Sequence, residues 1–355
     1  TRYERCKQGI TVGCPTDAIF LVEETMANGR TERSYFDKMN REVQSVETGF
    51  GDRTIYTRNY FNERGQLVRT SQPFFANETP HWNGWVYDPI GREIAQTQDD
   101  IIVSTTHYEG KKIIYTNALG QTRTEEFSVN GRLQRTVDTE GNALEYTYDA
   151  QGNTILIQYP GSHAVQMTYD LFGRQTSLSD PDIGLYHYTY NLGGELIWEQ
   201  DPMGQVTVFT YDTLGRPATR TDPEELTQFS YDNAPYAKGR LIEKVSRPPG
   251  SPTGLITSYT YGYDALSRPT STAMRFNSDA QTYTLGIRYD HIGRDSVLLY
   301  PGAQGSAASL RMVYDAQGFH VEVRNLSSGK VYWHLDSLDA RQNITQYTLG
   351  NGVVT

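Results

Sequence analysis

Apolar and polar side chains alternate, one for one, in short stretches through the middle of the chain. Alternation with a period of two, carried by Tyr, Phe, Val and Thr, is typical of a β-strand with one apolar and one polar face. The four clearest stretches place one face at Leu144, Tyr146 and Tyr148; at Val165, Met167 and Tyr169; at Tyr186, Tyr188 and Tyr190; and at Thr207, Phe209 and Tyr211. The alternation therefore predicts strands that end at these tyrosines.

A turn signal follows each of these strands. The last tyrosines of the four stretches are 21 residues apart, and each precedes Asp or Asn and then Gly. Asp bonds its own downstream backbone and Gly tolerates a positive φ, so the chain reverses there. A second set of turn positions has the same spacing of 21 residues: Asp138, Tyr159, Asp180, Asp201 and Asp222. Each of the last four directly precedes a proline. Two turns per period predict that each repeat is a β-hairpin and that the repeats form a meander.

The length of such a meander predicts its shape. Strands lie about 4.8 Å apart, so a dozen or so hairpins extend a sheet by about 120 Å. Twisted open sheets of more than about ten strands curl. We therefore predict an all-β fold with essentially no helix, in which a hairpin meander coils into a spiral strip or shell, β-solenoid-like or large and barrel-like. The tyrosines suit its inner wall because they combine a large ring with a hydroxyl.

The repeat extends through most of the chain with varying regularity. We expect a single array over residues 1–355, with irregular early repeats over 1–86, regular repeats over 87–240 and looser repeats over 241–355, where loops at 247–254 and 302–309 add length. Within the early part, the aromatic and proline-bearing segment 71–85 is either a recognition patch or a plug or cap folded onto the sheet.

Several copies of the motif depart from its regular form. In residues 34–41, Asn40 takes the glycine place, which Asn can occupy because it visits the left-handed region. Residues 60–65 repeat the motif with one insertion, and residues 335–341 are a late, altered copy. Asn130-Gly131 predicts a two-residue hairpin turn between strands at 125–129 and 133–137.

Composition narrows the possible partners. The formal charge of −10 and the pI near 5.2 argue against a nucleic-acid surface, which needs a basic footprint. The chain has no apolar run of the roughly 18 residues that a membrane span needs, and no signal peptide at Thr1, so any export is expected to depend on signals outside this chain. Cys6 and Cys14 allow a disulfide but do not establish one. Neither end has a polar capping unit, which leads us to expect an excerpt of a longer polypeptide.

The sequence contains none of the common catalytic and ligand-binding motifs. There is no nucleophile elbow, zinc-protease motif, phosphate loop or dinucleotide fingerprint. The seven histidines lack metal-ligand spacing, and Asp180-x-Asp182-x-Gly184 lacks the later ligands of a calcium loop. We therefore expect no catalytic residues, no cofactor and no metal.

The repeated motif itself resembles that of a known family. Residues 169–174, 211–216 and 289–294 all read Tyr-Asp-x-x-Gly-Arg, and they are similar to the YD repeats of the rearrangement hotspot (Rhs) family over roughly residues 35–355. This resemblance implies a β-strip that spirals into a hollow shell around a toxic C-terminal polypeptide, as in bacterial toxin complexes. The animal relatives are the teneurins, which are adhesion proteins with a similar shell.

One feature departs from the Rhs pattern. The Rhs repeat core ends in an Asp-Pro-x-Gly segment that resembles an aspartic protease site. Asp201-Pro202-Met203-Gly204 matches the four positions Asp-Pro-x-Gly but nothing further. It has the same 21-residue spacing as the other Asp-Pro turns. We therefore interpret it as a turn.

The resemblance leads to a hypothesis about function. We expect a non-enzymatic structural segment of a shell that encapsulates a toxin polypeptide, with that polypeptide and the remaining parts of the shell as partners. We expect the protein to be secreted or extracellular. The alternative is an extracellular adhesion or carbohydrate-binding module that displays loops such as 71–85 and 247–254.

Overall fold

A computed structural model describes residues 1–6, 14–27, 29–251, 253–277, 281–302 and 308–355. The regular secondary structure of these residues consists of strands, apart from two single turns of 3-10 helix, η1 (Phe50–Asp52) and η2 (Pro160–Ser162). The strands are β1 Arg2–Arg5, β2 Phe20–Thr25, β3 Thr31–Phe36, β4 Glu42–Thr48, β5 Thr54–Phe61, β6 Leu67–Ser71, β7 Phe74–Phe75, β8 Trp82–Tyr87, β9 Glu93–Gln98, β10 Ile101–Glu109, β11 Lys112–Asn117, β12 Thr122–Phe127, β13 Leu133–Val137, β14 Ala143–Tyr148, β15 Thr154–Gln158, β16 Ala164–Tyr169, β17 Gln175–Asp180, β18 Gly184–Tyr190, β19 Leu196–Gln200, β20 Val206–Tyr211, β21 Pro217–Thr221, β22 Leu226–Tyr231, β23 Leu241–Arg247, β24 Thr257–Tyr263, β25 Pro269–Phe276, β26 Thr282–Tyr289, β27 Asp295–Tyr300, β28 Ala308–Tyr314, β29 His320–Asn325, β30 Val331–Leu338 and β31 Ile344–Leu349.

The strands form one antiparallel meander, as the sequence predicts. Each strand pairs with the next along the chain, for example Met167 with Leu178 and Leu178 with Tyr186. The exception is β7, which pairs with the first half of β5 beside β6, so that β6 pairs directly with β8. Alternation is also confirmed, because in β18 the three tyrosines are half-buried and the residues between them are exposed. That the tyrosine face lines the interior stays a prediction.

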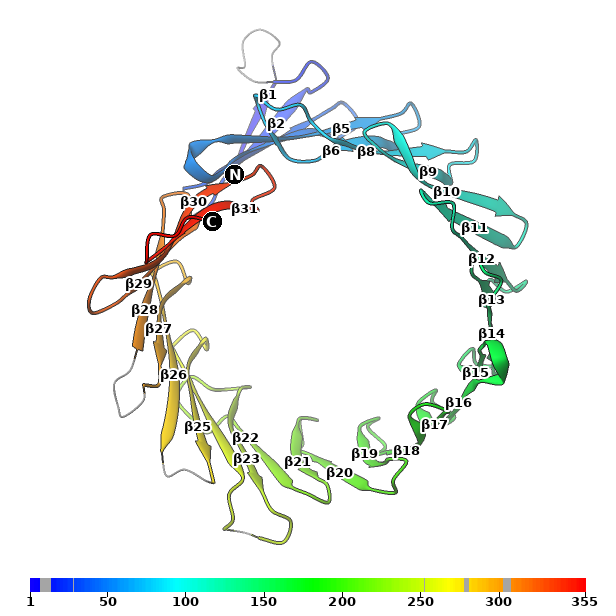
Figure 1. The fold of residues 1–355 in the computed structure, drawn as a ribbon, viewed down its shortest axis with the longest axis vertical. Coiled ribbons are helices and arrows are strands. Elements are labelled where there is room, and N and C mark those ends of the chain that lie inside the picture. Colours follow the sequence, from blue (N-terminus) through cyan, green and yellow to red (C-terminus); the bar gives the residue numbers. More distant parts are fainter. Residues whose placement is uncertain (7–13, 28, 252, 278–280, 303–307) are drawn as a thin grey trace.

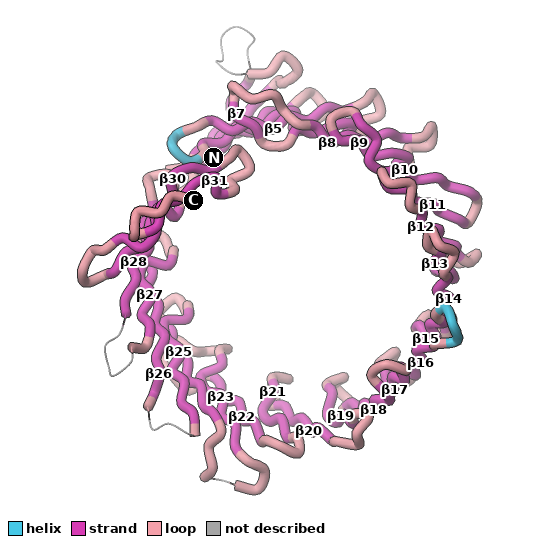
Figure 2. Tube along the Cα trace, viewed as in Figure 1, coloured by secondary structure: helices cyan, strands magenta, loops and turns pink. Residues whose placement is uncertain are grey.

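The meander coils into a ring that is one sheet thick (Figure 1, Figure 2). Its accessible surface of 21907 Å² is about 1.5 times the roughly 14,500 Å² expected for a compact chain of this mass. Such an excess is what a single layer with two open faces produces. The prediction of a coiled strip is therefore confirmed.

The ring closes where the end of the strip meets its beginning. The turn 315–319, between β28 and β29, lies against Arg30 and the turn 49–53. The Arg30 guanidinium lies 5.3 Å from the centre of the Phe319 ring, the rings of Phe319 and Phe50 meet edge to face at 5.8 Å, and the Gln317 amide donates to Asp52. The turn 339–343, between β30 and β31, lies against β4, β5 and β7, where the Gln342 amide donates to Glu47 at 3.2 Å. We call this side-chain contact between the two ends the seam.

The seam joins opposite edges of the strip. Turns that contain the Tyr-Asp motif lie along one edge, which we call the YD edge, and the turns of the second ladder lie along the other, which we call the second edge. The two turns from the end of the chain belong to the YD edge, and the turns they contact belong to the second edge. No backbone ladder joins β31 to β1 in the described ranges. The strip therefore advances by its own width in one circuit and forms a spiral rather than a closed barrel.

Buried apolar side chains concentrate near the seam and not along the whole wall. One cluster contains Ala18, Leu21, Tyr35 and Val43, and the half-cystines of the Cys6–Cys14 disulfide pack against it. The other contains Ile55, Phe75 and Ala340 and spans the seam. The disulfide that the sequence left open is therefore present, next to the first hairpins.

The structure corrects the boundaries of three motif copies. Residues 60–65 contain no insertion, because Phe61 takes the tyrosine place and Asn62 begins the turn. Asn130-Gly131 is not a two-residue turn: the loop runs from Ser128, whose backbone amide donates to Arg132 O at 2.8 Å. The late copy begins at Leu338 rather than Leu335, since Asp339 closes its turn. In each case the sequence-based position was wrong because another residue stands where the regular motif has its tyrosine or its aspartate.

The irregular and looser parts of the chain continue the same ladder. The loop 247–254 follows β23 as expected, apart from residue 252, which lies outside the described residues. Most of the expected loop 302–309 also lies outside them. The division of the array at residues 86 and 240 stays a prediction.

The burial of Ala340, which is 5% exposed between Ile55 and Phe75, predicts the effect of a charge placed there. Ala340→Lys should separate the seam, because a buried ammonium beside Arg53 would lack a partner. Hydrogen exchange of peptides covering residues 50–56 and 335–343 should become at least about tenfold faster, which corresponds to about 1.4 kcal/mol. The matched control is Ala265→Lys, at the same place of an exposed turn. Equal protection in both variants would contradict the seam.

Candidate functional site

The repeated turn is closed by one carboxylate. In the turn after Tyr169, the backbone amide of Asp170 donates to Arg174 O at 2.9 Å, and the amide of Gly173 donates to Asp170 O at 3.0 Å. Asp170 Oδ1 accepts from the amides of Phe172 and Arg174 at 2.8 and 3.0 Å, and its Oδ2 accepts from Arg174 Nε at 2.6 Å. The backbone reverses through Gly173 at a φ of 78°, which a glycine adopts without strain. We call this arrangement the Asp turn.

The Asp turn recurs on both edges of the strip. The same pair of amide bonds to Oδ1 is made by Asp37, Asn62, Asp88, Asn117, Asp138, Asp201, Asp212, Asp264, Asp290 and Asp315. Asn40 takes the glycine place with a φ of 59°, as predicted, and Ser267 does so at 57°. Asn and Ser tolerate the positions because the surrounding hydrogen bonds fix the turn.

Each tyrosine of the motif ties its hairpin to the previous one. The Tyr211 hydroxyl donates to Leu196 O at 2.8 Å, and Leu196 directly follows the Asp turn of the preceding unit. Eight tyrosines among the described residues make the equivalent bond, at 2.7–2.9 Å: Tyr87, Tyr148, Tyr190, Tyr211, Tyr231, Tyr263, Tyr289 and Tyr314. The tyrosine is therefore a link between units as well as a wall residue.

The arginine of the motif completes this link, which we did not anticipate from the sequence. The Arg268 guanidinium lies 4.1 Å from the centre of the Tyr289 ring in the next unit, while it also binds Asp264 in its own turn. The same stacking joins Arg92 to Tyr108, Arg132 to Tyr148, Arg174 to Tyr190, Arg216 to Tyr231 and Arg294 to Tyr314. The signal in the sequence was the arginine that recurs directly after the glycine.

Electrostatics favour the charged form of the aspartates and the neutral form of the tyrosines. The backbone amide of Arg216 and then its side chain lower the pKa of Asp212 despite partial desolvation. The Arg268 side chain and then its amide lower the pKa of Asp264 in the same way. Burial raises the pKa of Tyr211, and the charge of Glu195 adds to this. At neutral pH Asp212 and Asp264 thus remain acceptors and the Tyr211 hydroxyl remains a donor.

Asp201 lies in one of these turns. Its Oδ1 accepts from the amides of Met203 and Gln205 at 2.9 and 2.8 Å, so its carboxylate closes the turn that the Asp-Pro ladder predicts. This geometry agrees with our interpretation of residues 201–204 as a turn.

The aromatic segment 71–85 is part of the sheet, because it contains β7 and the first residues of β8. Phe74 and Phe75 are each 6% exposed, because β7 pairs with β5 and the Arg53 guanidinium lies 4.0 Å from the centre of the Phe75 ring. Buried side chains of this kind cannot present a recognition patch. Phe74 and Phe75 do not form a plug or cap either, because β7 pairs with β5 within the sheet.

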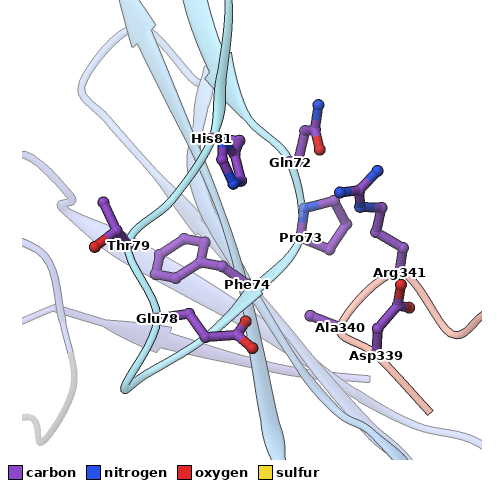
Figure 3. A pocket seen from close by; sticks show the side chains of 9 residues that line it. All are labelled: Gln72, Pro73, Phe74, Glu78, Thr79, His81, Asp339, Ala340 and Arg341. Carbon is purple, nitrogen blue, oxygen red and sulfur yellow. The ribbon is translucent and has the colours of Figure 1, made fainter. Parts of the chain in front are cut away.

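A pocket of about 380 Å³ lies at the seam beside this segment (Figure 3). Pro73 and Phe74 line one side, and the turn 339–341 lines the other. Its acidic groups serve the backbone: Glu78 accepts from the Phe75 amide at 3.0 Å, and Asp339 accepts from Asn343. Glu78 and Asp339 therefore stabilise the local turns on the two sides of the seam.

Within the described ranges, no three His, Cys, Asp or Glu side chains are placed to hold one metal ion. In the same ranges, no helix has the length and apolar character to cross a membrane.

The ladder of linked hairpins defines a YD-repeat shell strip. The sequence model of the teneurin YD-shell family matches residues 107–294, which is more than half of the chain. The chain therefore belongs to the teneurin YD-shell family. No curated protein sequence matches it.

Several solved structures share this fold. The crystal structure of TcdB2-TccC3 without its hypervariable C-terminal region has a TM-score of 0.72 at 16% identity, over 95% of this chain and 20% of that chain. The crystal structure of TcdB2-TccC3 has a TM-score of 0.71 at 16% identity, over 95% and 21%. The Photorhabdus luminescens Tc holotoxin pore with mutated TccC3 has a TM-score of 0.58 at 15% identity, over 94% and 20%. The chain thus spans about a fifth of the length of these structures, and the similarity is one of fold.

The inter-unit link predicts the effect of removing one hydroxyl. Tyr211→Phe should lower the free energy of unfolding by about 0.5–1.5 kcal/mol, because Leu196 O loses its hydrogen bond. Urea unfolding followed by circular dichroism measures this change. The control is Tyr186→Phe, since Tyr186 stacks on Tyr188 but has no hydroxyl partner in the described part of the chain. Equal losses in both variants would show that the hydroxyl does not link the units.

The lowered aspartate pKa values predict loss of stability in acid. A carboxylate whose pKa is lower folded than unfolded stabilises the fold above its unfolded pKa of about 3.9, and this contribution disappears as the pH falls through the folded pKa. The urea midpoint should therefore decrease from about pH 5 downward. Asp212→Asn with Asp264→Asn should be less stable than the unaltered chain at pH 7, and the difference should shrink below pH 4.

The control for this measurement is Asp182→Asn, at an exposed aspartate outside the repeated turn positions. It should follow the unaltered chain at every pH. A deficit of the double variant that stays constant between pH 7 and pH 3 would show that the charges of the Asp turns do not stabilise the wall.

Proposed function

We propose that this chain is a segment of a hollow shell that encloses and protects a toxin polypeptide until its delivery. The rest of the shell comes from further parts of the same polypeptide or complex, and the enclosed polypeptide is the cargo. The protein acts outside the cell that makes it, and export depends on signals outside this chain. The role is structural and not enzymatic.

One observation carries this proposal: a single-layer wall makes a full circuit, and no strand of the described residues crosses the space inside it (Figure 1). The turns that meet at the seam are separated by about 25 strands along the meander. At about 4.8 Å per strand the circuit is about 120 Å long and about 38 Å across. Packed sheets lie about 10 Å apart, so each side-chain layer is about 5 Å thick. Side chains from opposite walls therefore cannot meet, and a folded or extended polypeptide has room between them.

The chemistry of the repeats supports a structural role. The carboxylates of the Asp turns bind backbone amides, and most of the motif tyrosine hydroxyls bind backbone carbonyls. The conspicuous polar residues of the motif are thus engaged in holding the wall. The fold that the chain shares with Tc toxin components supports the choice of a toxin as cargo.

Protease protection tests the proposal. The natural polypeptide that carries these residues is treated with a nonspecific protease, and its fragments are followed by mass spectrometry. A cargo segment outside residues 1–355 should resist cleavage while the shell is closed. In the seam variant Arg53→Glu, which removes the Arg53 bond to Leu338 O, the same segment should be cleaved at least about tenfold faster.

The matched control is Arg311→Glu, at an exposed position in β28 that lies outside the seam. Its cargo should stay protected. Cleavage of every segment outside these residues at the same rate in the unaltered protein would exclude encapsulation.

A further inference from the structure

The YD edge carries a row of exposed apolar side chains. In an Asp turn such as 170–174, the second residue after the aspartate donates its backbone amide to the carboxylate, and the side chains of the two residues between the aspartate and the glycine are exposed. Those of Ile90, Val129, Phe172, Leu192, Leu214 and Leu266 are 72–106% exposed. We call these six residues the tip row. Large exposed apolar side chains thus recur from turn to turn along one edge, which makes this edge a candidate interaction site.

The same edge is covered at the seam, and there its partner is visible. Ala340, which follows the aspartate of its turn as Leu192 follows Asn191, is only 5% exposed against Ile55 and Phe75. Phe319, at the end of the preceding YD-edge turn, packs on Phe50. The covering residues belong to the first turns of the second edge and to the strands next to them. The tip row continues this covered stretch along the same edge.

The two edges match in spacing and in chemistry. Each edge has one turn for every two strands, so turns repeat about every 10 Å along both. The second edge also presents exposed apolar side chains, such as Leu119 at 84% and Met203 at 78%. At the seam, Arg53 of the second edge adds a hydrogen bond to the Leu338 carbonyl, and Glu47 beside it accepts one from Gln342.

We propose that the tip row docks on the second edge of a second copy of this chain. This contact would extend the one seen at the seam. The surfaces on the two sides differ, so the contact is heterologous and stacks rings head to tail. A second copy of this chain presents the required second edge. The proposal concerns the two edges of the strip and holds whether or not a cargo is enclosed.

Sedimentation velocity of the purified chain tests the contact. The unaltered chain should associate as its concentration increases. A tip variant, Phe172→Asp with Leu192→Asp and Leu214→Asp, should weaken association at least tenfold, and so should an edge variant, Leu119→Asp with Met203→Asp. A mixture of the two variants should form a one-to-one complex, because the edge variant keeps an intact tip row and the tip variant keeps an intact second edge.

The control carries the same added charge on strand faces. Gln166→Asp with Thr168→Asp and Thr189→Asp changes three exposed residues of β16 and β18, and it should associate like the unaltered chain. Circular dichroism confirms that every variant is folded. A chain that stays monomeric at about 100 µM, a tip variant that associates normally, or a mixture that forms no one-to-one complex would each overturn the proposal; the protease experiment on cargo is unaffected by any of these results.

Discussion

A wall that is one sheet thick has no second layer against which to bury its faces, and this constraint governs the whole structure. Folded domains ordinarily gain their stability from a core between two layers. Here the buried apolar clusters lie near the seam, so the rest of the wall depends on contacts between neighbouring hairpins. The tyrosine hydroxyl, the stacked arginine and the Asp turn supply those contacts. Each is worth only about 1 kcal/mol, but they recur in unit after unit along the strip.

The arginine of the motif contacts two neighbouring hairpins at once. Arg216 binds Asp212 in its own turn, binds Asp232 of the next turn and stacks on Tyr231. A change at this position therefore affects two hairpins at once. The stability of the wall is a sum over adjacent units, as in other repeat proteins, and local loss of one link does not require the whole ring to unfold.

The sequence predicts the local structure well because local structure is set by local chemistry. Alternation along residues 184–190 identifies a strand and its two faces, and Asp170 with Gly173 identifies a turn, since each signal lies within a few residues. The Arg268 to Tyr289 stacking was missed because it joins residues 21 apart through space, and a motif written along the chain does not show which side chains meet. Copies with replaced anchors, such as Phe61 for tyrosine and Ser128 for aspartate, were misplaced for the related reason that the geometry of the turn persists after its usual residues have changed.

The seam could not be predicted in this way, because its position depends on the curvature of the whole strip. A small change in twist at each strand, summed over a circuit, decides whether residue 340 meets residue 55 or another part of the edge. The outcome has a physical consequence. A closed barrel would be held by a backbone ladder, whereas this ring is closed by side chains such as Arg53, Phe319 and Ala340. A contact of that kind can separate without breaking any strand pairing. The wall can thus remain intact while the ring opens at one place.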